Sequence, residues 1–319
     1  MSAISQDAAT ATKPQQSFAQ RQRWSLIVLG VTIISAVVQL VAGGTTIIGV
    51  LFEPLLIALM LILPRKFPAI NVLAGKTRAR LIAEVRPLLG YALLFPALLI
   101  PVVIWGSVQN LPLFPDRTTS WVLSWNYIVV GKILLLFVPA IYFGWRIGGN
   151  GQQFGFSGIT GAWRWIGPSI ITLLYAALLA LDFLGGNVPA IPFLPAVTTI
   201  ILIILAAGFT EEFFYRVLLQ TRLENLVGRW NGIAITTFLF ALLHLPSRYA
   251  FVWRGHTGNP VFDLGLALTA VIVSKGITGY ALGFLWSRYR NLWINVILHT
   301  LIDGLPLVLL VAGAAVKIS

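Results

Sequence analysis

Two adjacent carboxylates and an arginine follow a long apolar run in the stretch TEEFFYR, which begins at Thr210. On a helix, Glu212 and Arg216 are four residues apart and share one face, whereas Glu211 points about 100° away from Glu212. Because a charged group inside a bilayer costs several kcal/mol unless it is paired or hydrated, the stretch predicts either a buried ion pair or a polar site that works within the membrane.

Further polar residues lie on two later apolar segments. His244 lies near the end of one, and His299 and Asp303 lie four residues apart on the other. At 1.5 Å per residue, Glu211, His244 and His299 stand about 15, 20 and 12 Å above the inner ends of their segments. Three segments thus bring acid/base groups to a similar depth. Such a set could perform proton transfer or bind a divalent metal through N and O donors.

The composition is that of a polytopic membrane protein. Of the 319 residues, 58% are hydrophobic and only 10% are charged, against about 25% charged in soluble domains. The apolar runs are long enough to predict helices rather than a barrel. The absence of cysteine excludes disulfides and thiol nucleophiles. The net charge of +12 is explained by basic cytoplasmic loops, and we expect no nucleic-acid partner.

We predict an all-α, polytopic transmembrane helical bundle of about eight to nine spans. Eight spans would result if the first two runs formed a single kinked or re-entrant element. The predicted spans are 24–42, 46–63, 87–105, 121–143, 166–184, 191–220, 233–245, 264–286 and 292–312.

The basic residues predict the orientation of the bundle. With a cytoplasmic N-terminus, 15 of the 22 Lys and Arg residues fall in inner segments, as the positive-inside rule requires. The prediction is a multi-pass protein of the cell membrane. It has a disordered cytoplasmic tail at 1–22, N-terminal transmembrane helices at 23–165, and a bundle at 166–319 that holds the polar site.

Three motifs in this order carry a resemblance to a known family. They are E-E-x-x-x-R from Glu211, F-x-x-x-H from Phe240 and H-x-x-x-[ND] from His299. The set resembles the CPBP family (CAAX protease and bacteriocin-processing, also called Abi) of intramembrane proteases, which includes the type II CAAX prenyl endopeptidases. The resemblance covers about 191–310, and the first 160 residues match none of its motifs.

The resemblance implies an endopeptidase that hydrolyses peptide bonds of membrane-associated or lipidated, CAAX-type substrates through a glutamate-activated water. Glu211 would be the general base. Glu212 and Arg216 would hold the site, and His244 and His299 would bind the water, the substrate carbonyl or a metal. The expected partners are a peptide or lipidated protein substrate within the membrane and the lipid bilayer itself.

Asp303 departs from the pattern, because many CAAX-processing members have Asn at this position. An ionised Asp cannot donate a hydrogen bond to an oxyanion, so Asp303 would instead orient His299 or bind a metal. The predicted ligands of a divalent metal such as zinc are therefore Glu211, His244, His299 and Asp303. Catalysis by glutamate alone stays open beside this metal-assisted alternative.

Two other functions remain open from the sequence. A proton-coupled transporter would use Glu53, Lys132, Asp182 and Lys275 as further relay groups, but we find no internal repeat of the kind such proteins show. A non-catalytic immunity or scaffold protein would tolerate substitution of Glu211. The G-x-S-G match at 155–158 is typical of rhomboid proteases, but it lies in a glycine-rich loop rather than on an apolar helix.

Overall fold

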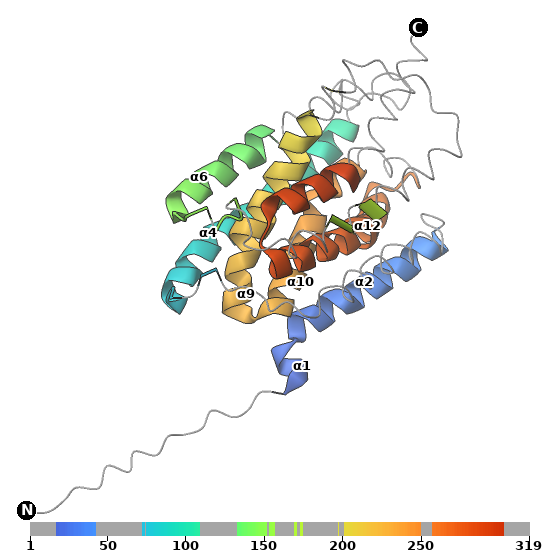
Figure 1. Ribbon diagram of the computed structural model, residues 1–319. Helices are drawn as coiled ribbons and strands as arrows, with labels where there is room; N and C mark the ends of the chain where they lie inside the picture. The colour runs from blue at the N-terminus through green and yellow to red at the C-terminus, as the bar shows by residue number, and fades with distance from the viewer. Residues whose placement is uncertain are drawn as a thin grey trace, which may run out of the picture.

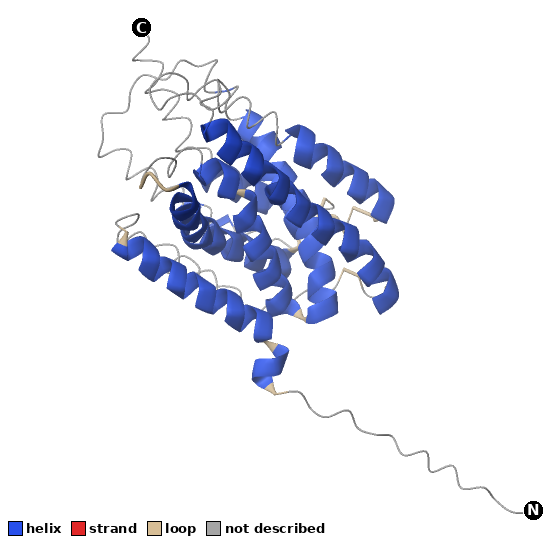
Figure 2. Cartoon of the chain, turned by 180° about the vertical axis from the view of Figure 1, so that it is seen from behind, coloured by secondary structure: helices blue, strands red, loops and turns tan. Residues whose placement is uncertain are grey.

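The computed structural model describes the helical framework of the bundle. Every regular element in the described part of the chain is helical (Figure 2), which confirms the predicted all-α class. The predicted span 46–63, most of the span 166–184 and Asp303 lie outside the described residues. The structure describes 17–42, 72–73, 75–108, 133–151, 153–156, 169–170, 173–174, 197, 201–249 and 257–302.

Three of the described helices are long and apolar enough to cross a membrane. They are α2 (Arg23–Val41), α4 (Arg78–Val108) and α12 (Pro260–Tyr289). They coincide with the first, third and eighth predicted spans, although α4 begins nine residues earlier than predicted. A single turn, α1 (Phe18–Arg21), precedes α2 and is closed by a capping box at Ser17.

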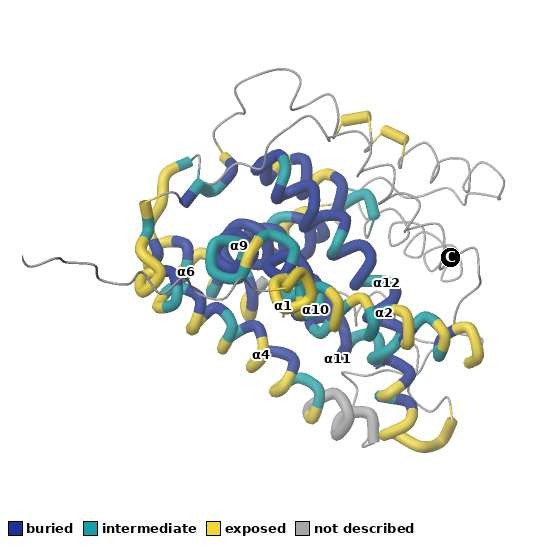
Figure 3. The backbone as a smooth tube through the Cα atoms, turned by 90° about the horizontal axis from the view of Figure 1, so that it is seen from below, coloured by how far each residue is buried: buried dark blue, intermediate teal, exposed yellow. Residues whose placement is uncertain are grey.

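The centre of the bundle is the pair formed by α12 and α10 (Arg229–Leu243), and α2 packs along both (Figure 1). Of the most apolar stretch of α12, 56% is buried, against only 11% for α2. Burial is therefore concentrated in the middle of the bundle, while α2 turns most of its apolar side chains outwards (Figure 3), where lipid would cover them.

The segment that carries TEEFFYR is wound partly as a π-helix. It comprises η2 (Ile204–Phe209), η3 (Glu212–Gln220) and α9 (Thr221–Val227). Several side chains along this segment donate hydrogen bonds to backbone carbonyls five residues earlier in the chain. For example, Oγ1 of Thr221 donates to the carbonyl of Arg216 (3.0 Å). π-Helical turns are rare and frequently mark functional sites.

Three further helical elements pack around this segment. On one side of η3 lie η1 (Ile133–Phe137) and α6 (Val138–Ile147) (Figure 1). The last described helix, Leu292–Ile302, packs closely against η2. Gly208 makes this approach possible, because a Cβ atom at this position would lie 3.1 Å from the carbonyl oxygen of Val296. The absence of a side chain at Gly208 thus helps to bring the two glutamates beside His299.

Candidate active site

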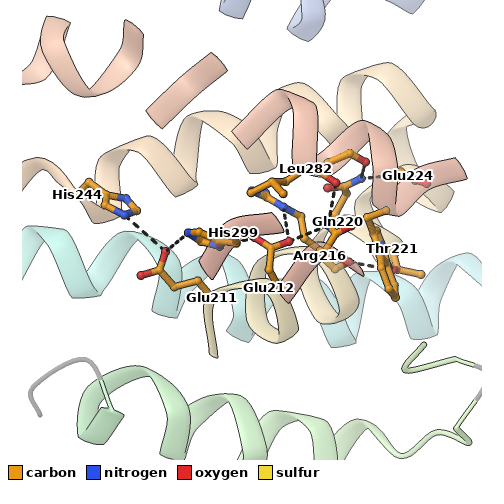
Figure 4. Close-up of polar contacts among 12 residues, drawn as sticks. Glu211, Glu212, Arg216, Gln220, Thr221, Glu224, His244, Leu282 and His299 are labelled. Atoms are coloured by element: carbon orange, nitrogen blue, oxygen red, sulfur yellow. Dashed lines mark hydrogen bonds and ion pairs between the residues drawn. The ribbon is translucent and has the colours of Figure 1, made fainter. Parts of the chain in front are cut away.

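Glu211 lies at the start of η3 and is fully buried. Its Oε2 atom lies 3.5 Å from Nε2 of His244 and 3.8 Å from Nε2 of His299. Figure 4 shows the two imidazoles reaching this carboxylate from different elements. The three segments predicted to reach a similar depth therefore meet at one carboxylate oxygen.

His244 is held by the end of α10. Its Nδ1–H donates to the carbonyl of Phe240 (3.0 Å), and since a carbonyl can only accept, this bond directs the lone pair of a neutral imidazole to Nε2. The residue is the C-cap of α10. The helix ends here because Pro246 has no N–H to continue the hydrogen-bond ladder. The local sequence thus turns Nε2 of His244 towards Glu211.

Glu212, which is also fully buried, is surrounded by donors. Oε1 accepts a hydrogen bond from Nδ1 of His299 (2.9 Å), and Oε2 accepts one from Nδ2 of Asn295 (2.8 Å). Nε of Arg216 lies 3.3 Å from Oε2. This ion pair is the one predicted from the four-residue spacing of Glu212 and Arg216. A carboxylate with a cation and two further donors is stable as an anion even when buried.

The aromatic ring of Phe240 packs against three of these side chains. The guanidinium carbon of Arg216 lies 4.6 Å from the ring centroid of Phe240, within cation–π range. The rings of His244 and His299 lie 4.9 and 5.6 Å from the same ring. Phe240 therefore packs against both imidazoles and the arginine, and keeps this side of the site apolar.

The structure brings five of the six predicted site residues into one continuous set of contacts, and Asp303 lies outside the described residues. The sequence reasoning missed Asn295, whose Nδ2 also donates to the carbonyl of Leu282 (2.9 Å) and so ties Glu212 to α12. The signal was present, because Asn295 lies four residues before His299 on the same helix face. The roles predicted for these residues stay predictions.

The described residues do not by themselves provide a metal centre. Among them, no group of three or more His, Asp, Glu or Cys side chains is arranged to hold a metal ion. The predicted four-ligand set includes Asp303, which lies beyond the described part of the helix. The metal therefore stays a prediction, and the chemistry below is derived from the residues of the chain.

Comparison with known families finds a similarity over part of the chain. Residues 193–305 match the family described as type II CAAX prenyl endopeptidase Rce1-like. The match agrees with the resemblance to the CPBP family and contains all six predicted site residues. The searches of curated proteins and of solved structures gave no significant match.

The matched region can be compared with the helices of the structure. The match includes η2, η3, α9 to α12 and the helix Leu292–Ile302, so it contains every described residue of the site, and it excludes α2 and α4. Both excluded helices nevertheless pack against matched ones, α2 on α10 and α12, and α4 on α9 and α11 (Leu245–Arg248). The site thus lies inside the matched domain, with the N-terminal helices packed around it.

Proposed function

We propose that the protein is an intramembrane endopeptidase that cleaves lipidated, CAAX-type proteins with a water molecule activated by Glu211. The observation that carries this proposal is the convergence of Nε2 of His244 and Nε2 of His299 on Oε2 of Glu211. The match to an endopeptidase family supports the reaction class.

The convergence favours a bound water. With Nδ1 used as a donor, neutral His244 presents a lone pair to a carboxylate oxygen. Two acceptors that face one another repel unless a proton lies between them. Distances of 3.5 and 3.8 Å exceed those of good direct hydrogen bonds. A water has two protons to give, and a buried water typically makes about three hydrogen bonds.

In the proposed reaction, Glu211 takes one proton from the water while the water oxygen bonds to the scissile carbonyl carbon. The electron pair of the C=O double bond moves to the carbonyl oxygen and forms an oxyanion. When the oxyanion collapses, the C–N bond breaks and the proton held by Glu211 passes to the leaving amine. One water is consumed, and one carboxyl group and one amino group are produced. Positioned acid/base groups of this kind contribute about 10²–10⁴-fold to the rate.

The two histidines would have different roles in this reaction. His299 lies between Glu211 and Glu212, so the carboxylates on both sides stabilise its imidazolium form, and protonated Nε2 would donate to the oxyanion. His244 donates to a neutral carbonyl instead, which suits a neutral imidazole that accepts from the water. The fixed arginine and amide around Glu212 keep His299 in place.

The direct test is cleavage of a fluorescent, farnesylated CAAX peptide by the purified full-length protein in detergent. We expect a single cut on the carboxyl side of the prenylated cysteine, detected by mass spectrometry. The same peptide without the lipid should be cleaved at least tenfold more slowly. If no peptide is cut under any condition while the folded protein drives proton-coupled uptake in vesicles, the transporter alternative would replace the proposal.

A further inference from the structure

The N-terminus of α10 and the C-terminus of α12 meet at the end of the bundle that the sequence predicts to face the cytoplasm. Nε of Arg229 donates to Oγ of Ser287 across this junction (2.8 Å). The side chain of Asn231 accepts from the backbone N–H of Ser25 (3.2 Å) and donates to the carbonyl of Arg21. Three chain segments that each carry arginine are thereby held side by side (Figure 1).

A stack of aromatic rings supports the arginines. Trp230 lies parallel to Tyr280 and to Phe284, with ring centroids 6.4 and 6.0 Å apart. The guanidinium of Arg229 lies 5.1 Å from the Trp230 ring and 5.2 Å from the Phe284 ring, and that of Arg288 lies 5.6 Å from the Phe284 ring. Two cations therefore share one aromatic surface. Trp and Tyr are also the residues enriched at the membrane–water interface.

Positive charge at this junction exceeds negative charge. The charges of Arg288 and Arg290 repel that of Arg229, and Glu224 is the neighbouring acid that attracts it. Glu224 is already engaged, because it accepts hydrogen bonds from Arg290 and from Gln220 (2.7 Å). Since like charges held close together are destabilising, an external anion bound here would relieve the repulsion.

The backbone adds an anion-binding element. Helix α10 is 15 residues long and begins after Gly228, whose positive φ of 89° turns the chain and which provides no side-chain cap. A Cβ atom built on Gly228 would meet no atom within 4 Å, so there is open space beside the first turn. Backbone N–H groups at such a terminus attract phosphate and carboxylate groups.

We propose that the junction binds the phosphate headgroup of an anionic phospholipid. This headgroup site consists of Arg229 and Arg288, the rings of Trp230 and Phe284, and the first turn of α10. Arginine binds phosphate through paired N–H donors, and the aromatic stack would hold the site at the depth of the headgroups. The site is separate from the glutamates and histidines, and the proposal does not depend on peptidase activity.

The test is a lipid titration by native mass spectrometry of the full-length protein in a neutral detergent. The probes are phosphatidylglycerol, phosphatidylcholine and inorganic phosphate. We expect a first phosphatidylglycerol to bind at least tenfold more tightly than phosphatidylcholine. Each juxtamembrane arginine contributes about fivefold to the binding of anionic lipid, so Arg229→Gln with Arg288→Gln should weaken phosphatidylglycerol binding about 25-fold.

The matched control is Arg86→Gln with Arg146→Gln. It removes the same two charges from exposed positions on α4 and α6 and should change the binding less than twofold. The double variant of Arg229 and Arg288 could prove too unstable to purify, because Arg229 makes the bond to Ser287. In that case Arg288→Gln alone, which keeps this bond, should still weaken binding about fivefold.

Two results would overturn the proposal. The first is an equal loss in both double variants, which would make the preference an effect of overall charge. The second is displacement of bound phosphatidylglycerol by millimolar inorganic phosphate as effectively as by added phosphatidylglycerol. That result would identify a site for soluble phosphate instead. A lipid preference found in a protein that cuts no peptide would leave the headgroup site standing while the proposed function failed.

Discussion

Two of the places where carboxylates meet cations in the described part of the bundle are built differently. At the predicted cytoplasmic end, Glu84 is bonded by Lys76 (2.7 Å) and by Arg222 (2.9 Å), so its charge is balanced by permanent cations. In the candidate active site, Glu212 is balanced in the same way by Arg216. Glu211, its neighbour in sequence, instead faces imidazole nitrogens, which gain and lose a proton near neutral pH.

The type of partner decides what each carboxylate can do. A carboxylate held by an arginine is locked as an anion and fixes the parts that it joins. A carboxylate that faces imidazoles can accept a proton and pass it on. We therefore predict that Glu84 and Glu212 hold the bundle and that Glu211 takes part in the reaction, although Glu211 and Glu212 are adjacent in the chain. Substitutions of these residues and of their partners test this division.

After substitution of Glu211, His244→Ala should cause the largest change in activity. Loss of the imidazole removes an acceptor for the water, and we expect kcat/KM for the farnesylated peptide to fall about 10³-fold. The midpoint of thermal unfolding in detergent should move by less than about 3 °C, because the hydrogen bond that His244 donates to Phe240 lies within its own helix. A large fall in that midpoint with partial activity would instead place His244 among the structural residues.

Arg216→Ala should cause the largest change in stability. It leaves the charge of Glu212 buried without its arginine, and breaking such a pair costs about 3–5 kcal/mol. Chemical unfolding followed by circular dichroism measures the loss. The division between the two glutamates predicts that Arg216→Ala with Glu212→Gln recovers part of that stability, and additive losses in the double variant would contradict it.

Asn295→Ala tests the residue that the sequence reasoning missed. The hydrogen bond to the Glu212 carboxylate should be worth about 1.5–3 kcal/mol, and a displaced His299 should lower kcat about tenfold with little change in KM. Asn295→Gln, which keeps the amide, is the conservative control and should recover part of kcat. A change confined to KM would point to substrate binding instead of positioning.

Removal of metal should have the smallest effect. If a water activated by Glu211 carries the reaction without a metal, extended dialysis against a chelator should change kcat less than twofold. Metal content would be measured on the same samples. A loss of activity that follows the loss of bound metal, and its recovery with zinc, would instead support the predicted ligand set with Asp303.

The sequence predicted the part of the site that depends on spacing within one segment. Glu212 and Arg216 are neighbours because they are four residues apart, and the polar groups at similar depth did meet. The sequence could not show that His299 pairs with Glu212 through Nδ1, because that contact joins η3 to a distant helix. Nor could it show the π-helical turns of η3, since a stretch of 9 residues is too short for its wider turn to leave a distinct period.

The fold shows the same limit. The apolar runs predicted the ends of α2 and α12 to within four residues, and those of α4 to within nine. They could do so because the thickness of the bilayer fixes the length of a span. The close approach at Gly208 was not predictable, since a glycine in an apolar run does not reveal which helix it faces. The N-terminal orientation and the domain boundaries stay predictions.

The account is tested most directly by comparing Glu211→Gln with Glu212→Gln, with peptide cleavage and thermal unfolding measured on the same preparations. It predicts that Glu211→Gln lowers kcat/KM at least 10³-fold and leaves the unfolding midpoint unchanged or higher, while Glu212→Gln lowers the midpoint markedly because Arg216 loses its counter-ion. Glu84→Gln serves as the control for activity. Cleavage by Glu211→Gln at the rate of the unsubstituted protein would contradict the account.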